Sequence, residues 1–352
     1  MVNETAAIIS KGDKMTYQEL LENARKKMAP QCRVCKECNG VVCKGEIPGT
    51  GGKGSGAAFK ICIDFLNSVK IKLDTIYENE GQDTSISLFG ETFKYPFFVA
   101  PIGGMNLNYN GAMTEAEYVE AVVSGAIKAG TAAFTGDGAN DRFFLDSLPA
   151  IKKAEGKAVP TLKPWKNDKV LEKVRLLEET NAMAFAMDID SAGLINLALA
   201  GKPVSAKSVK ELSEITSATN VPFIVKGVMT AEGAKKALEA GAYGIVVSSH
   251  GGRVLEHAPA TCAVLTEIRE AVGDKIKIFV DGGIRSGADV FKAIALGADA
   301  VLIGRPYVIA AHGGGAEGVE MYTEKIGAEL RDIMIMSGCE NLKDITRDKI
   351  VL

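Results

Sequence analysis

The chain has 352 residues, of which 47% are hydrophobic and 24% charged, and its formal net charge is −3. This composition is that of a globular protein, and the weak negative charge argues against nucleic acid or an anionic membrane as a partner. Residues 1–14 lack the apolar core of a signal peptide, and no apolar run reaches membrane-spanning length. We therefore expect a cytoplasmic protein with neither a nucleic-acid nor a membrane partner.

The N-terminal region predicts a short amphipathic helix over residues 16–28. Thr16 and Glu19 have the spacing of a capping box, and apolar side chains follow from Leu20 to Met28 at helical intervals. This helix opens an extension that we place at residues 1–90, ahead of a larger unit at residues 91–352.

Four of the seven cysteines follow this helix with the spacing C-x2-C-x2-C-x4-C; they are Cys32, Cys35, Cys38 and Cys43. In a cytoplasmic enzyme such a group is more often metal-binding or redox-active than disulfide-bonded. A metal or iron–sulfur cluster bound by these cysteines is one interpretation. Reduced thiols in a compact loop, with no metal, are the other, and both stay open.

From residue 96 onward, short apolar runs alternate with stretches of helical periodicity. The runs are residues 97–101, 132–135, 159–162, 184–187, 223–226, 244–248, 278–281 and 300–304. Helical patterns lie between most of them, including residues 208–219, 230–240, 262–272 and 286–296, and one or two more helices are expected within residues 313–338. This number of β/α units predicts an α/β fold, a (β/α)8 TIM barrel with an N-terminal helical, cysteine-containing extension. A doubly wound open sheet is the alternative, although it usually has fewer strands.

Polar residues gather where these predicted strands end. They are Asp188, Lys226, Ser248, His250, Arg253, Asp281, Arg285 and Arg305. In a barrel, the carboxyl ends of the strands form the catalytic face, so these side chains are expected to meet there.

His250 and Arg253 form the most informative pair in this set. Two glycines separate them in the run Ser-Ser-His-Gly-Gly-Arg, which lets the backbone turn tightly after the strand. Histidine accepts a proton near neutral pH, and arginine binds a carboxylate through two parallel hydrogen bonds. Together they suit the oxidation of an alcohol adjacent to a carboxylate.

The chain resembles the FMN-dependent α-hydroxy-acid oxidase and dehydrogenase family, which includes glycolate oxidase and lactate oxidase. The strongest matches are residues 222–227, 248–253, 258–261, 280–285, 289–297 and 303–306, and weaker ones include Asp188 and residues 55–57, 83–85 and 100–101. The resemblance implies FMN as the cofactor and a 2-hydroxy acid or related anion as the small-molecule substrate. It also implies a homotetramer or octamer.

The resemblance assigns the flavin contacts to particular residues. Gly283, Arg285, Gly304 and Arg305 would hold the FMN phosphate, and Lys226 would lie near the pyrimidine edge of the flavin, where its charge stabilises the reduced form. Pro101, Ser248 and Asp281 would complete the cofactor site.

The resemblance likewise assigns the catalytic residues. His250 would take the proton of the substrate hydroxyl, Asp188 would orient the imidazole, and Arg253 would bind the substrate carboxylate. Oxidation of a lactate-like 2-hydroxy acid to the 2-oxo acid is the expected reaction.

Three positions depart from the family pattern, and all three fall on expected substrate contacts. Lys53 and Lys163 stand where the family has tyrosines, and Leu194 stands where it has a second arginine. Lys53 and Lys163 are therefore tentative substrate contacts for a more negatively charged or differently shaped substrate; solvated lysines are the alternative. Two functions compete with this one. The first is a flavoprotein oxidoreductase or isomerase that acts on another anion, with or without a metal or iron–sulfur cluster at the cysteines. The second is a flavin-binding or metal-sensing protein without turnover.

Overall fold

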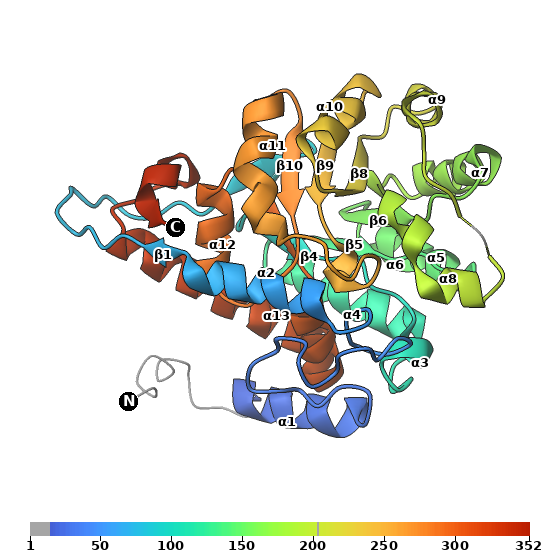
Figure 1. Cartoon of the computed structure of the whole chain (residues 1–352). Coiled ribbons are helices and arrows are strands. Elements are labelled where there is room, and N and C mark those ends of the chain that lie inside the picture. Colours follow the sequence, from blue (N-terminus) through green and yellow to red (C-terminus); the bar gives the residue numbers. More distant parts are fainter. Residues whose placement is uncertain (1–14, 203) are drawn as a thin grey trace.

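The computed structural model describes residues 15–202 and 204–352, and eight parallel strands close a barrel at its centre (Figure 1). Around the barrel the order is β10-β11-β4-β5-β6-β7-β8-β9. The strands are β4 (Phe97–Val99), β5 (Ala133–Thr135), β6 (Ala158–Leu162), β7 (Phe185–Asp188), β8 (Phe223–Val228), β9 (Gly244–Val247), β10 (Lys277–Val280) and β11 (Ala300–Ile303). The predicted (β/α)8 barrel is confirmed, and each predicted apolar run overlaps one of its strands.

The barrel interior is filled by alternate residues of the strands. One buried layer contains side chains that include Ala186, Ile224, Val246 and Phe279. Because successive strand residues face opposite sides, the residues two positions later face the interior again, nearer the carboxyl ends. Those positions carry Asp188, Lys226, Ser248 and Asp281. The apolar layer thus supports a polar layer at the mouth.

An antiparallel hairpin packs on the apolar layer from the other end of the barrel. Its strands are β2 (Ile86–Leu88) and β3 (Glu91–Phe93), and its turn falls at the predicted boundary at residue 90. Phe89 in this turn stacks on Phe279 of β10, with ring centroids 6.1 Å apart. The open end of the barrel is therefore the one formed by the carboxyl ends of the strands.

Helices surround the barrel, and the predicted helices at residues 208–219, 230–240, 262–272 and 286–296 are confirmed. The helices around the barrel are α3 (Met105–Asn108), α4 (Glu115–Lys128), α5 (Arg142–Leu145), α6 (Leu148–Lys153), α7 (Asn167–Glu178), α8 (Ile195–Leu199), α9 (Val209–Ser217), α10 (Ala231–Glu239), α11 (Leu265–Val272), α12 (Gly287–Ala295) and α13 (Arg305–Met336). Short 3-10 helices are η1 (Ile189–Gly193), η2 (His250–Gly252), η3 (Thr261–Val264), η4 (Leu342–Asp344) and η5 (Arg347–Lys349). Within the described ranges, no helix is both long and apolar enough to cross a membrane.

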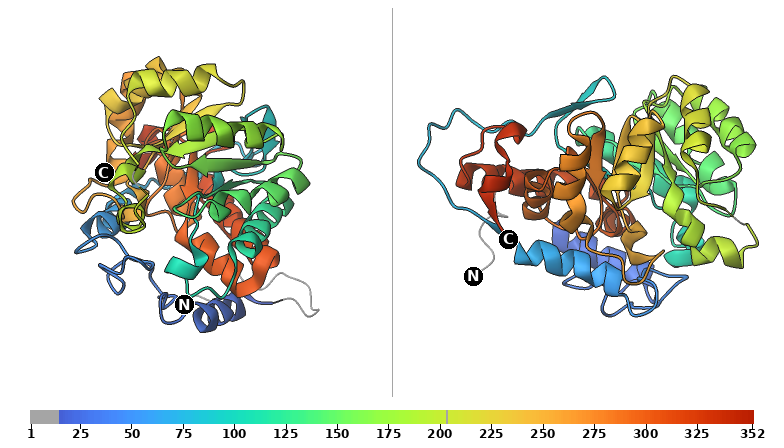
Figure 2. Two further views of the ribbon diagram at one scale, coloured as in Figure 1. Left: turned by 90° about the vertical axis from the view of Figure 1, so that its right-hand side faces the viewer. Right: turned by 45° about the horizontal axis from the view of Figure 1, so that its top comes forward.

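The N-terminal segment lies along one side of the barrel (Figure 2). Its helices are α1 (Tyr17–Met28), which packs against α13, and α2 (Ala57–Ser68), which packs against η2 and η3. The predicted capping box of α1 is present, because the Thr16 and Glu19 side chains each accept a hydrogen bond from the other's backbone. A two-stranded sheet pairs β1 (Lys70–Ile71) with β12 (Ile350–Val351).

Candidate functional site

A cavity of about 410 Å³ opens at the carboxyl ends of the barrel strands. Its size is in the range of small-molecule and cofactor sites. The predicted site residues that line it are Pro101, Lys163, Asp188, Lys226, His250, Arg253, Asp281, Gly283, Arg285, Gly304 and Arg305. The loop at residues 136–140 also lines this cavity.

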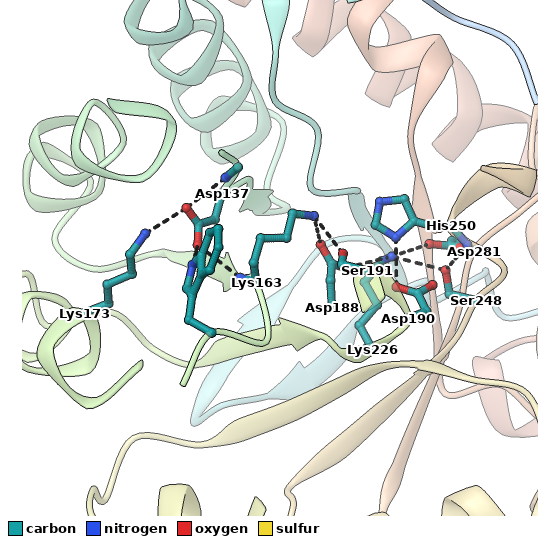
Figure 3. A network of polar contacts seen from close by, with 12 residues as sticks. Asp137, Lys163, Lys173, Asp188, Asp190, Ser191, Lys226, Ser248, His250 and Asp281 are labelled. Carbon is teal, nitrogen blue, oxygen red and sulfur yellow. Dashed lines mark hydrogen bonds and ion pairs between the residues drawn. The ribbon is translucent and has the colours of Figure 1, made fainter. Parts of the chain in front are cut away.

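A chain of buried ion pairs crosses the floor of the cavity (Figure 3). The carboxylate of Asp188 lies 2.8 Å from Nζ of Lys163 and 3.0 Å from Nζ of Lys226. Lys226 also lies 3.5 Å from Asp281 and donates to Oγ of Ser248. Asp188 and Lys226 are register partners at the ends of β7 and β8, which explains why their side chains meet.

Electrostatics hold Asp188 and Lys226 in their charged forms. Burial on its own would raise the pKa of Asp188, but Lys163 and Lys226 outweigh it, and the pKa lies below its usual range. Burial would likewise lower the pKa of Lys226, whereas Asp188 and Asp281 raise it. Burial raises the pKa of Asp281, and Lys226 opposes that shift.

The predicted base, His250, contacts a different aspartate from the one predicted to orient it. Nδ1 of His250 lies 2.9 Å from Oδ1 of Asp190, which follows β7 in η1. The prediction that Asp188 bonds the imidazole is therefore wrong, because the two lysines take up its carboxylate. Asp190 stands only two residues after Asp188, so the sequence offers both as partners of His250. Which of the two contacts the imidazole depends on Lys163 and Lys226, which are distant in the sequence.

Asp188, Asp190 and His250 also bring their ligand atoms within 4.8 Å of one another, as a metal site would require. Two ammonium groups already neutralise Asp188. Asp188 therefore has little negative charge left for a cation.

Asp137 is a buried residue of the site that the sequence did not single out. Its carboxylate accepts hydrogen bonds from the Lys163 backbone N–H and the Trp165 indole, and it lies 2.8 Å from Nζ of Lys173. These contacts fix the segment after β6, and with it the direction of the Lys163 side chain.

The backbone at His250 adopts an uncommon conformation. His250, Gly251 and Gly252 have φ values of 55°, 63° and 76°, in the left-handed region that favours glycine. A Cβ at Gly251 would lie 2.6 Å from Nη1 of Arg305, and one at Gly252 would lie 2.6 Å from the backbone nitrogen of Phe59. The two glycines therefore allow the turn that presents His250 to the cavity.

Three arginines of the cavity wall bond to neutral carbonyl groups, whereas the lysines of its floor pair with carboxylates. Arg253 donates to the carbonyls of Gly49 and Gly51 and to the Asn108 side chain. Arg305 donates to the carbonyls of residues 50, 51 and 251, and Arg285 to those of residues 38 and 284. Among the described residues none of the three forms an ion pair with a carboxylate. Burial lowers the pKa of Arg253 to about 10, so it remains charged at neutral pH.

The start of α13 adds backbone donors to this side of the cavity. No side chain caps α13 at Gly304, whereas the side chains of Ser286 and Asp289 cap α12. An uncapped helix N-terminus is suited to an anion because its first N–H groups lack intrahelical acceptors.

Two predicted contacts are not where they were expected. Lys53 is absent from the cavity wall, and its amine donates to the carbonyl of Val254 at 3.0 Å. Ser248 lies beneath the wall, where its Oγ accepts from Lys226 and from the backbone N–H of His250. Ser248 therefore positions two site residues from below, and the geometry does not support a substrate contact by Lys53.

The predicted cysteine cluster lies beside this site. Cys32, Cys35, Cys38 and Cys43 all line a second, small cavity of about 30 Å³ between α1 and the start of α13. Burial raises the pKa of the Cys32 thiol to about 11, and the neighbouring thiols add to that shift.

Comparison with known proteins places this site in a family. The sequence profile described as FMN-dependent dehydrogenase matches residues 49–198 and 198–352. A glycolate oxidase of Spinacia oleracea is 43% identical over 152 residues, which are 43% of this chain and 41% of that protein. A peroxisomal (S)-2-hydroxyacid oxidase of Arabidopsis thaliana is 46% identical over 143 residues, which are 41% of this chain and 39% of that protein. The matched stretch thus spans about two fifths of the length of these curated relatives.

Solved structures give a longer match. Mandelate oxidase with 3,3-difluoro-2-hydroxy-3-phenylpropionic acid is 28% identical with a TM-score of 0.78, covering 94% of this chain and 97% of that chain. A mandelate oxidase mutant with the monooxide FMN adduct is 29% identical with a TM-score of 0.72, covering 86% of this chain and 93% of that chain. With the profile matching most of its length, the chain belongs to the FMN-dependent dehydrogenase family.

Proposed function

We propose that this chain binds FMN at the mouth of the barrel and oxidises a 2-hydroxy acid to the 2-oxo acid. The observation that carries the proposal is the composition of the cavity wall. Three arginines that have no carboxylate partner within residues 15–202 and 204–352 line a space that is also lined by His250, whose imidazole contacts Asp190. Uncompensated guanidinium charges beside a cavity favour anionic ligands, and both FMN and a 2-hydroxy acid are anions.

The residues present fit FMN. Arg285, Arg305 and the uncapped start of α13 would hold the phosphate, and Lys226 would face the flavin ring. When bound, FMN would supply the acceptor for the hydride that leaves the α-carbon of the substrate. Gly283 and Gly304 in the wall allow close approach of a ligand to the backbone.

His250 and Arg253 would act on the substrate. The imidazole would accept the hydroxyl proton, so that the substrate loses a proton from its hydroxyl oxygen and a hydride from its α-carbon. Asp190 would hold the imidazole through Nδ1, leaving Nε2 for the substrate, and would stabilise the charged ring after proton transfer. Arg253 would bind the substrate carboxylate in place of some of its present carbonyl partners.

The other walls of the cavity indicate a substrate with an apolar side chain. They carry several apolar residues: Ile102, Leu107, Phe143, Leu194, Leu197 and Leu199. The Lys163 ammonium group also lines the cavity, but it donates to Asp188 and Ser191 and is therefore not available for a second substrate carboxylate. We infer that monocarboxylic 2-hydroxy acids with aliphatic or aromatic side chains are preferred over 2-hydroxy diacids.

Anaerobic reduction of the bound flavin tests this function directly. A panel of 2-hydroxy acids with hydrogen, aliphatic, aromatic and carboxylate side chains is added, and bleaching of flavin absorbance is followed by stopped flow. The aliphatic or aromatic acids should bleach it fastest. A chain that holds FMN but is not reduced by any member of the panel would contradict the proposal.

The His250→Asn variant should lower the rate of flavin reduction by roughly 10²- to 10⁴-fold, which is the usual contribution of a general base. His257→Asn is the matched control, because the His257 side chain is 79% exposed. Equal rates in the two variants would remove His250 from the chemistry.

The predicted homotetramer or octamer remains a prediction, which light scattering of the flavin-loaded protein would check.

A further inference from the structure

The sulfur atoms of four cysteines gather in the N-terminal extension at a place that the proposed reaction does not use. The thiols of Cys32, Cys35, Cys38 and Cys43 line one cavity together with the apolar side chains of Met28, Val42 and Ile309. Three of them follow one another at intervals of three residues, so a single loop presents them in succession. Cysteines gathered in this way, partly shielded from water, are suited to soft metal ions.

We propose that these four cysteines bind an iron–sulfur cluster. Repeated C-x2-C spacing is typical of loops that wrap such clusters. Donors toward the sulfur atoms are already in place: the Val34 backbone N–H lies 3.5 Å from Sγ of Cys32, and Nη2 of Arg285 lies 3.7 Å from Sγ of Cys38. Donors to ligating sulfur atoms stabilise the negative charge of a bound cluster.

The separation of the sulfur atoms favours a cluster over a single zinc ion. Zinc–sulfur bonds of about 2.3 Å in a tetrahedron place the sulfur atoms roughly 3.8 Å apart. In the described part of the chain, no three of these cysteines bring their Sγ atoms within 4.8 Å of one another. Bridging iron and sulfide ions hold their cysteine ligands farther apart than one ion does, so the wider spacing suits a cluster better than a single zinc ion.

The location of the cysteines connects them to the flavin site. Tyr109 and Arg305 line both cavities, so the two spaces share part of a wall. Arg285 lines the larger cavity and donates to both the carbonyl and the sulfur of Cys38. A redox group held by these cysteines would therefore be separated from bound FMN by a thin layer of side chains.

This placement gives the cluster a role, which rests on the proposed function. Oxidation of one 2-hydroxy acid delivers two electrons to FMN. The cluster would accept them one at a time and pass each to an external one-electron carrier protein, so that two carriers are reduced for each 2-oxo acid formed. The hydroxyl proton would leave through His250, and the hydrogen delivered as hydride would be released to solvent as a second proton when the two electrons pass to the carriers.

The cluster is tested first by composition, independently of any substrate. Protein purified without oxygen should contain iron and acid-labile sulfide in equal amounts, about four of each for a cubane cluster. It should also show a paramagnetic signal after reduction with dithionite. The Cys35→Ala/Cys38→Ala double variant should lose iron, sulfide and signal. The control Cys339→Ala should keep all three, because Cys339 is buried elsewhere in the core and its sulfur hydrogen-bonds to residues 337 and 344. Zinc in place of iron, or no metal, would overturn the proposal.

The relay is tested by adding the best 2-hydroxy acid to the anaerobic protein without any other acceptor. In the wild type, bleaching of the flavin should be followed by the signal of the reduced cluster. The double variant should still bleach its flavin but reduce added cytochrome c at least tenfold more slowly. A cluster that substrate never reduces would overturn the relay. Failure of every acid to bleach the flavin would instead contradict the proposed function, while the iron and sulfide counts stand.

Discussion

The positive charges on the floor of the cavity are paired with carboxylates, whereas those of the three arginines in its wall, the arginine wall, have no such partner among the described residues. On the floor, Lys163 and Lys226 are buried and share the carboxylate of Asp188. In the wall, Arg253, Arg285 and Arg305 have carbonyl partners but no carboxylate among the described residues. A buried charge must be neutralised inside the fold or by a ligand. The buried floor is therefore complete without a ligand, whereas the partly buried wall offers unpaired guanidinium charge to an anion.

This difference separates positioning from binding. The carbonyls that now accept from Arg253 and Arg305 belong largely to the loop around Gly49 and Gly51. Hydrogen bonds to neutral carbonyls are weaker than those to an anionic oxygen, so a phosphate or carboxylate can replace them. The ion pairs of the floor have no such competitor and fix the geometry under the reacting atoms.

Removing the carboxylate of the floor should produce the largest effect. Asp188→Asn leaves Lys163 and Lys226 buried with one fewer negative charge, and breaking a buried ion pair in this way costs about 3–5 kcal/mol of folding free energy. Urea unfolding monitored by circular dichroism measures that loss. Asp274→Asn is the control, since its side chain is 98% exposed, pairs with Arg269 and should contribute less than about 1 kcal/mol. Equal losses in the two variants would contradict the comparison.

The same carboxylate predicts how stability depends on pH. Lys163 and Lys226 overcome the effect of burial and hold the pKa of Asp188 below its usual value, so the folded protein stays ionised where the unfolded chain binds a proton. The contribution is complete above the unfolded pKa of about 3.9 and is lost as the pH falls below it toward the folded pKa. Melting temperatures measured from about pH 6 to pH 3 should therefore fall more steeply for the wild type than for Asp188→Asn. Parallel curves would show that other carboxyl groups control acid unfolding.

Removing a wall arginine should weaken ligand binding while leaving the fold intact. Hydrogen bonds to charged groups are worth about 1.5–3 kcal/mol, which is roughly 10- to 150-fold in affinity. Arg305→Met should raise the Kd for FMN by that factor, and Arg253→Met should mainly raise KM for the 2-hydroxy acid. Arg33→Met is the control, because Arg33 is exposed and pairs with Glu46 on the surface. Loss of FMN binding in Arg253→Met but not in Arg305→Met would reverse the assignments.

The fold was predictable because it depends on patterns that are local in the chain. The eight apolar runs marked the strands, and a capping box such as that of Ser286 and Asp289 marked the helix α12. His250 was predictable for the same reason, since its glycine-rich motif follows a strand directly. The partner of His250 was not, because Asp188 and Asp190 differ only in what reaches them from β6 and β8. Buried Asp137 was missed because a polar turn has the same sequence pattern whether or not lysine and tryptophan side chains cover it.

Substitution of Lys53 should have the smallest effect on kcat/KM, because its side chain lies outside the cavity wall. Its amine lies on the carbonyl of Val254, outside the wall, whereas Lys163 reaches Asp188 within it. Lys53→Met should therefore change kcat/KM by no more than about threefold, which corresponds to well under 1 kcal/mol. Lys163→Met should lower both kcat/KM and stability, because Asp188 loses one of its two partners. Steady-state kinetics of both variants on the best 2-hydroxy acid make this comparison. A large effect confined to KM in Lys53→Met would mean that the loop carrying Lys53 closes over the substrate, and the arginine wall would then extend to include it.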